Sequence, residues 1–204
     1  MNMLTNIKKS ADELKLVVLT NIIKMLINRN YLNKAQFENY ISKIQEKLNR
    51  PTYTFSDDVN KDNKQIININ FLTDSSITKK QSIFKNIEFN SAENHYIFII
   101  VDPKVTKYLK ELKHVSNVEL FDYNDFFIDK ANYILTPPHR QLSPEESIQI
   151  LEQYNVTFAQ LPKILRSDPM IRYYNMPSGA ICEITPVSEI SGSFVRYRGV
   201  INSL

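Results

Sequence analysis

Few residues in this sequence have the types and spacing that catalysis needs. Glu111-Leu112-Lys113 spells the Glu-x-Lys half of a nuclease metal site. It falls in a helical pattern, however, where residues two apart point to different faces, whereas on a strand they would align. The histidines His95, His114 and His139 are scattered, with no second ligand at helix or hairpin spacing. We therefore predict no catalytic residue, no metal site and no cofactor.

The best short basic cluster consists of Lys79-Lys80 and Lys85. Such lysines can contact phosphates, although most clusters of this kind are simply solvated. The formal net charge is only +3, and the excess lies wholly in residues 1–130. A domain that binds duplex DNA on its own is usually more basic, with its charge in one patch. This composition predicts weak and salt-sensitive contact with DNA.

Cysteine count and hydropathy exclude further classes. Cys182 is the single cysteine, which rules out an internal disulfide framework and a Cys-rich zinc site, and we expect it to be a packed small side chain. No run approaches the ~18 apolar residues of a membrane span, and the N-terminus lacks a signal-peptide cleavage pattern. We expect a soluble, intracellular protein with no membrane partner and no small-molecule substrate.

The most specific signal is a series of short pieces near the C-terminus. They include His139, Gln160-Leu161-Pro162, Asp168-Pro169, Ser188-Glu189, Gly192 and Tyr197-Arg198. The order and spacing of these pieces, from Ile134 to the end, resemble without a gap the assembly domain of the fifth subunit of eukaryotic DNA-directed RNA polymerases, a family that includes the archaeal counterpart of this subunit.

The resemblance implies a non-catalytic polymerase subunit, with nucleotide addition performed by other chains. Its C-terminal domain would dock on the largest subunit, and its N-terminal jaw would line the path by which downstream duplex DNA enters. Lys79, Lys80 and Lys85 would then make long-range phosphate contacts. The alternative is a free-standing DNA-binding transcription factor or a relic nuclease. It would require a strong basic stripe or an acidic pair with lysine on a strand, and neither is visible.

Candidate interface residues lie in the last strand of the assembly-like region. Arg196 and Arg198 stand on one face of that strand, with Tyr197 on the other. They form either a surface row of salt bridges or, together with Glu189, an interface with the largest subunit. Seven further positions are expected to have structural roles: His139, Gln160, Leu161, Pro162, Asp168, Pro169 and Gly192.

Local signals in the C-terminal region predict helices first and strands last. Ser143-Pro144-Glu145-Glu146 is a capping box with proline at the first helical position, and Ile148, Leu151 and Tyr154 share one face of that helix. Thr157 to Gln160 repeats the capping pattern for a second, short helix near Pro162. Asp168-Pro169 opens a third, with Ile171 and Tyr174 pointing inward. Strands follow at Ile181 to Thr185 and Phe194 to Ile201, joined by a loop in which Gly192 can supply positive φ.

The N-terminal region reads as α/β. Helices are expected from about Asp12 to Asn28 and from the Asn33/Gln36 capping box to Leu48, and the polar stretch Asp57 to Lys64 is expected to be a loop. Ile67 to Phe71 alternates like a half-buried strand, whereas Tyr96 to Val101 is apolar throughout, as in a central strand. A helix to about Lys113 and a strand from Val118 to Phe121 complete a βαβ unit with parallel neighbours.

The patterns therefore predict an α/β domain over residues 1–130 and a small α+β domain over residues 131–204. The resemblance implies that the first is a jaw domain with a restriction-endonuclease-like sheet and that the second is the assembly domain. We place the boundary between Asp129 and His139, where Pro137-Pro138 resists regular structure. The jaw resemblance is fainter, and the archaeal counterpart lacks this domain. Ile190, Asn175 and Pro186-Val187 depart from the family pattern and favour a diverged, giant-virus type of polymerase. Localisation would be nuclear for a cellular polymerase, and the virion or virus factory for a viral one.

Overall fold

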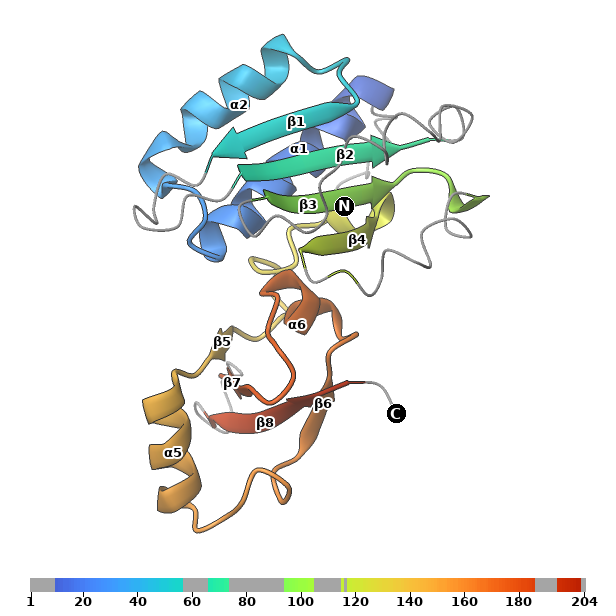
Figure 1. The fold of residues 1–204 in the computed structure, drawn as a ribbon. Coiled ribbons are helices and arrows are strands. Elements are labelled where there is room, and N and C mark those ends of the chain that lie inside the picture. Colours follow the sequence, from blue (N-terminus) through green and yellow to red (C-terminus); the bar gives the residue numbers. More distant parts are fainter. Residues whose placement is uncertain are drawn as a thin grey trace, which may run out of the picture. The chain divides into compact units, whose positions relative to one another are not determined.

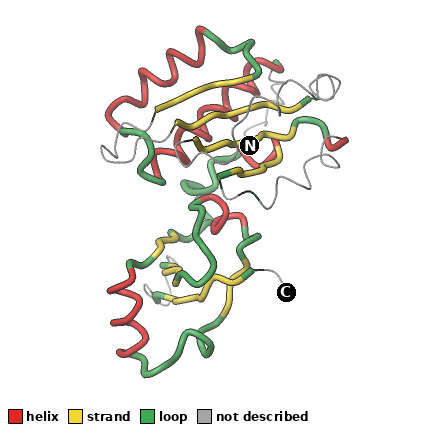
Figure 2. The backbone as a smooth tube through the Cα atoms, viewed as in Figure 1, coloured by secondary structure: helices red, strands yellow, loops and turns green. Residues whose placement is uncertain are grey.

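The computed structural model describes residues 10–56, 66–73, 94–104, 115, 117–185 and 194–202 of the 204-residue chain. The chain divides into two compact units, residues 1–128 and 129–204 (Figures 1 and 2). Within the described ranges, every helix is too short or too polar to cross a membrane. The predicted loop at Asp57 to Lys64, the helix to Lys113 and the Glu111-Leu112-Lys113 pattern lie outside these ranges.

The N-terminal unit is a four-stranded sheet with two helices on one face. Its strands are β1 (Thr52–Ser56), β2 (Ile66–Leu72), β3 (Asn94–Ile100) and β4 (Val118–Asp122), in that spatial order. The edge strand β1 is antiparallel to β2, whereas β2, β3 and β4 are parallel. The parallel pairing of β3 and β4 agrees with the predicted βαβ unit, but β1 was not predicted.

Helices α1 (Ala11–Asn28) and α2 (Phe37–Glu46) cover the face of the sheet that carries Tyr53 and Phe55. The predicted first helix is confirmed to within a residue. The predicted Asn33 cap starts a 3-10 turn, η1 (Lys34–Gln36), and not α2 itself, because Asn33 Oδ1 accepts from the Ala35 N–H. A second 3-10 turn, η4 (Tyr123–Phe126), follows β4.

Three helices end in the same way, at an asparagine with positive φ. Asn30, Asn155 and Asn175 have φ of 60°, 50° and 50°. In each case the asparagine N–H donates to the carbonyl oxygen three residues earlier, as Asn30 does to Ile27. The N–H of the following residue donates to the carbonyl oxygen five residues earlier, as Tyr31 does to Leu26. This is the Schellman pattern, in which glycine is usual and asparagine is the next best residue. Asn175 therefore departs from the family's glycine without losing the turn.

A buried charge cluster ties the end of α1 to the sheet. The Arg29 guanidinium donates to both carboxylate oxygens of Glu119 at 2.6 and 2.8 Å, and His95 Nε2 lies 2.7 Å from Glu119 Oε1. The three side chains are only 2% (Arg29), 13% (Glu119) and 7% (His95) exposed. Burial alone would raise the pKa of Glu119, but the Arg29 charge and the bonds from His95 and Arg29 outweigh it and lower that pKa to about 2.

The C-terminal unit is a second four-stranded sheet, in the order β5-β7-β8-β6. It contains β5 (His139–Gln141), α5 (Pro144–Gln153), β6 (Lys163–Leu165), α6 (Pro169–Tyr173), β7 (Ile181–Ile184) and β8 (Arg196–Ile201). The central pair β7 and β8 is antiparallel, and β6 joins β8 in parallel. Two apolar clusters form its core. One gathers Ile171, Met176, Cys182, Ile184 and Val200, and the other Leu142, Leu161 and Ile181.

The predicted α+β character of this unit is confirmed, with two differences. Residues 158–160 form a turn and not a short helix, although Gln160 Oε1 does accept from the Thr157 N–H at 2.8 Å. The helix cannot continue because Pro162 lacks an N–H and the next residues pair with β8 as β6. The short strands β5 and β6 were not predicted, since three residues are too few for an alternating pattern to stand out.

Candidate subunit interface

The first interface candidate, α5, presents apolar side chains to solvent. Ser143 caps it as predicted, because its hydroxyl accepts from the Glu146 N–H while Glu146 bonds back to the Ser143 N–H. Of the predicted face, only Leu151 packs into the core, beside Ile150. Ile148 and Tyr154 are 58% and 55% exposed. This is a correction to the predicted face, and it leaves two large side chains available to a partner.

The second candidate is β8, where the predicted alternation holds. Arg196 and Arg198 lie opposite Ile184 and Cys182 of β7, on the face that also carries the buried Val200, and Tyr197 lies on the other face. Arg196 is exposed and has no ion-pair partner among the described residues. Arg198 is half-buried, and its Nη1 lies 3.5 Å from the carbonyl oxygen of Lys163. Arg198 is thus less accessible to a partner than Arg196.

A charged row crosses the other face of the sheet, and sequence reasoning missed its centre. Arg140 donates to Glu183 at 3.1 and 3.2 Å and to Glu146 at 2.8 and 2.9 Å, so it joins β5, β7 and α5. The hydrogen bonds that Arg140 donates to Glu183 and then to Glu146 raise the pKa of Arg140, while the bonds from the Ser143 N–H and then from Arg140 lower the pKa of Glu146. Tyr197 lies opposite Glu183 in register. Arg140 and Glu183 are 43 positions apart, so spacing gave no signal.

Two motif positions act through local hydrogen bonds. Asp168 caps α6 by accepting from the Met170 and Ile171 N–H groups at 2.8 and 3.3 Å, and Pro169 takes the first helical position, as predicted. His139 Nδ1 lies 2.7 Å from the Pro137 carbonyl oxygen, at the first residue of β5. Leu161 is buried in the core, next to exposed Gln160 and Pro162.

Other predicted site residues fall outside the described part of the chain. They are Glu189, Gly192, Lys79, Lys80, Lys85 and His114. Among the described residues, no three His, Cys, Asp or Glu side chains are grouped as metal ligands would be. His95 is paired with Glu119, as described above.

Cys182 is a buried free cysteine, as predicted. Burial is the main cause that raises the pKa of its thiol to about 12. Because the thiolate is the nucleophile, this side chain is a packing element of the core below Arg198 and not a reactive group.

Gly199 is the position on β8 where size matters most. A Cβ added there would lie 2.8 Å from two ring atoms of Phe158, whose ring packs on the Ile181 cluster and lies below the Lys163 ammonium. We expect Gly199→Ala to lower the free energy of unfolding of this unit by about 1 to 3 kcal/mol, because the half-buried Phe158 ring must shift against the core cluster on which it packs. A denaturant titration of the C-terminal unit measures the loss.

The control is the double variant Gly199→Ala/Phe158→Leu. A smaller, more flexible side chain at 158 should recover part of the stability that Gly199→Ala loses relative to Phe158→Leu alone. If the two losses are simply additive, the Phe158 contact is not the cause.

The sequence of this chain is similar to those of several known proteins. The family profile described as "RNA polymerase Rpb5, C-terminal domain" matches residues 128–200. The chain is 42% identical over 78 residues to "DNA-directed RNA polymerase subunit Rpo5" of Pyrococcus horikoshii, which covers 38% of this chain and 93% of that relative. It is 28% identical over 204 residues to "DNA-directed RNA polymerase subunit 5" of Acanthamoeba polyphaga mimivirus, with 95% of each chain covered.

Coverage of the eukaryotic relatives is lower. The chain is 34% identical over 83 residues to "DNA-directed RNA polymerases IV and V subunit 5B" of Arabidopsis thaliana, which is 41% of this chain and 38% of that relative. Two further eukaryotic relatives are matched over 64% and 47% of their length.

The C-terminal unit is thus a domain of the kind found in small subunits of multisubunit DNA-directed RNA polymerases. This domain contains the capped helix α6, the buried Leu161 and the strand β8. Within that class, the chain belongs to the family of DNA-directed RNA polymerase subunit 5 and archaeal Rpo5. The family resemblance inferred from the sequence is confirmed.

Proposed function

We propose that this chain is a non-catalytic subunit of a DNA-dependent RNA polymerase, with other polymerase subunits as its partners. The observation that carries the proposal is the match of residues 128–200 to the Rpb5 C-terminal domain, together with the full-length similarity to a viral subunit 5. Purification of the tagged chain from its source should bring down the large polymerase subunits in stoichiometric amount. Recovery of the chain alone, under conditions that keep the polymerase intact, would overturn the proposal.

We infer further that the C-terminal unit makes the contact with the largest subunit. Exposed arginine and aromatic side chains are the groups most used as interface anchors. Arg196 on β8 and Tyr154 on α5 meet that description, with the half-buried Arg198 and Tyr197 beside Arg196, and Glu189 is a further candidate from sequence. A stable interface also needs apolar area, which exposed Ile148 and Phe194 supply.

The two units are proposed to be independent domains, with the boundary between Asp129 and His139. The separate sheets of the two units support this division. A fragment of residues 129–204 should give dispersed amide signals and one cooperative melt, because both apolar clusters of this unit lie within it. A disordered spectrum without a cooperative melt would place the boundary elsewhere.

The N-terminal unit is proposed to be the jaw beside the path of downstream DNA, with a restriction-endonuclease-like fold. Its parallel strands β2, β3 and β4 and the excess of positive charge in residues 1–130 support this role. In a cell the protein would act in the nucleus, and in a viral system in the virion or virus factory.

Replacing Lys79 and Lys80 with alanine should weaken retention of downstream DNA by the assembled polymerase and leave assembly intact. The reason is that each lost phosphate contact reduces affinity and its dependence on salt. DNA retention is measured at several salt concentrations. The matched control replaces the exposed Lys34 and Lys104. An equal loss of DNA retention in both double variants, or unchanged DNA retention in the Lys79/Lys80 variant, would contradict a DNA-facing role for Lys79 and Lys80.

A further inference from the structure

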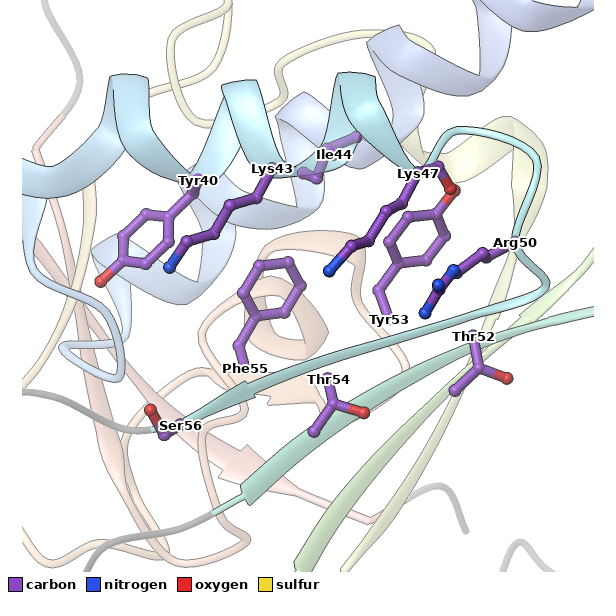
Figure 3. Close-up of a pocket in the computed structure, with 10 residues that line it drawn as sticks. All are labelled: Tyr40, Lys43, Ile44, Lys47, Arg50, Thr52, Tyr53, Thr54, Phe55 and Ser56. Atoms are coloured by element: carbon purple, nitrogen blue, oxygen red, sulfur yellow. The ribbon is translucent and has the colours of Figure 1, made fainter.

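A cationic groove runs between α2 and the edge strand β1 of the N-terminal unit. It has a volume of about 290 Å³. Of the described residues that line it, three are cations, Lys43, Lys47 and Arg50, and none is acidic. Figure 3 shows the Lys43 and Lys47 side chains pointing from α2 toward β1.

The three cations are available to a ligand. Their side chains belong to exposed residues, and none has a carboxylate partner among the residues that the structure describes. Lys43 and Lys47 are four residues apart at the C-terminal end of α2, which places them on one side of the helix, and Arg50 follows in the turn and lines the same groove. An unneutralised row of this kind favours an anionic partner.

The other wall of the groove is an open sheet edge. The Phe71 N–H bonds the Pro51 carbonyl oxygen, so residues 51 and 71 form a hydrogen-bonded pair. Because such pairs alternate with non-bonded pairs along an antiparallel ladder, the backbone N–H and C=O of Thr52 and Thr54 point away from β2. No described residue bonds these backbone groups. They alternate as donors and acceptors, as an added strand requires.

We propose that this groove binds an acidic peptide segment in extended conformation, which pairs with β1 and places carboxylates against Lys43, Lys47 and Arg50. The spacing of Lys43 and Lys47 fits, because four helical residues advance about 6 Å and alternate residues of a strand about 6.7 Å. Two acidic side chains at alternate positions of the peptide would therefore face Lys43 and Lys47, and Arg50 lies further along the same groove. The proposal is independent of the polymerase assignment.

The walls of the groove favour a peptide over single-stranded nucleic acid. Its aromatic residues Tyr40, Tyr53 and Phe55 are only 3%, 6% and 9% exposed. Tyr40 and Phe55 pack edge to face at 6.0 Å, and the Tyr53 hydroxyl donates to the Leu48 carbonyl oxygen at 2.7 Å. Bases bind single-strand sites by stacking on exposed aromatic rings, and these rings are occupied within the core.

The test uses the full chain and a fluorescein-labelled peptide that alternates valine and glutamate, Val-Glu-Val-Glu-Val-Glu, with binding followed by anisotropy at low salt. The Lys43→Glu/Lys47→Glu variant should weaken binding at least about tenfold, because attraction becomes repulsion in a site open to solvent. The Lys34→Glu/Lys104→Glu variant carries the same change in net charge on exposed lysines away from the groove, and it should bind nearly as the parent does. A thermal melt of each variant confirms that α2 is intact.

Backbone pairing is tested on the peptide and not on the protein. Two N-methylated versions, one methylated on the valines and one on the glutamates, block opposite edges of the extended chain. One version should lose binding and the other should keep it, since only one edge faces β1. No peptide binding, equal binding by both versions, or equal binding by an oligothymidylate of the same charge would each overturn the proposal.

Discussion

Replacing Glu119 with glutamine should lower the free energy of unfolding of the N-terminal unit by about 3 to 5 kcal/mol, because it removes the carboxylate charge that pairs with the buried Arg29 guanidinium. Glutamine keeps the size of the side chain and one acceptor oxygen, so the loss reports charge and not volume. This loss is measured by a denaturant titration of the full chain in which the unfolding of the N-terminal unit is followed. Glu38→Gln, on the exposed side of α2, is the matched control and should change stability little.

The same cluster gives this unit a defined response to acid. The folded pKa of Glu119, about 2, lies below its ordinary value of 4.5. The carboxylate therefore contributes stability that is complete above pH 4.5 and is lost as the pH falls toward 2, by about 3 kcal/mol in total. In Glu119→Gln this part of the acid dependence should be absent. An unchanged acid dependence, or a loss no larger than that of Glu38→Gln, would show that the cluster is not stabilising.

Reversing the charge at Arg196 and Arg198 should prevent incorporation of the chain into the polymerase. A reversed charge held against its former partner costs about 3 kcal/mol or more, which is the size of an interface hot spot. Arg196→Glu alone should leave the thermal melt unchanged because this side chain is exposed, whereas Arg198→Glu should cost some stability because Arg198 is half-buried over β6. The measurement is co-purification with the largest subunit, beside a melt of each variant.

Arg166→Glu is the matched control for this pair, since Arg166 is an exposed arginine of the same unit in the turn after β6. It should be incorporated as the parent is. If the double variant assembles normally, the interface lies elsewhere. If the Arg196→Glu variant alone unfolds, the arginine is structural.

Local signals in the sequence predicted the elements whose causes are local. The Ser143 capping box and the Asp168-Pro169 start need only neighbours within three residues, and both were predicted correctly. The apolar run that became β3 was also clear, because a strand buried on both faces is apolar at every position. The order of motif pieces led to the family, which the comparisons confirm.

Features that depend on distant residues could not be read in the same way. The β1 strand at Thr52–Ser56 does alternate exposed hydroxyl residues with the buried Tyr53 and Phe55, but so short a run does not show that it pairs with β2. The Thr54 hydroxyl donates to the side-chain oxygen of Asn68 at 3.0 Å, and a local sequence pattern does not predict this contact because the two residues are 14 positions apart. Likewise Glu119 meets Arg29 across 90 positions and Arg140 meets Glu183 across 43. That a charged residue pairs with a distant partner can be recognised only in the folded structure.

A photo-crosslink from the segment just before β8 tests the central claim most directly. Phe194, which is 66% exposed and lies two residues before Arg196, can be replaced by a photoreactive phenylalanine with little change in size. After irradiation of the assembled complex, the account predicts one major adduct between this chain and the largest polymerase subunit. Irradiated complexes in which position 194 captures no polymerase subunit, although the chain is present, would contradict a polymerase interface on the C-terminal unit.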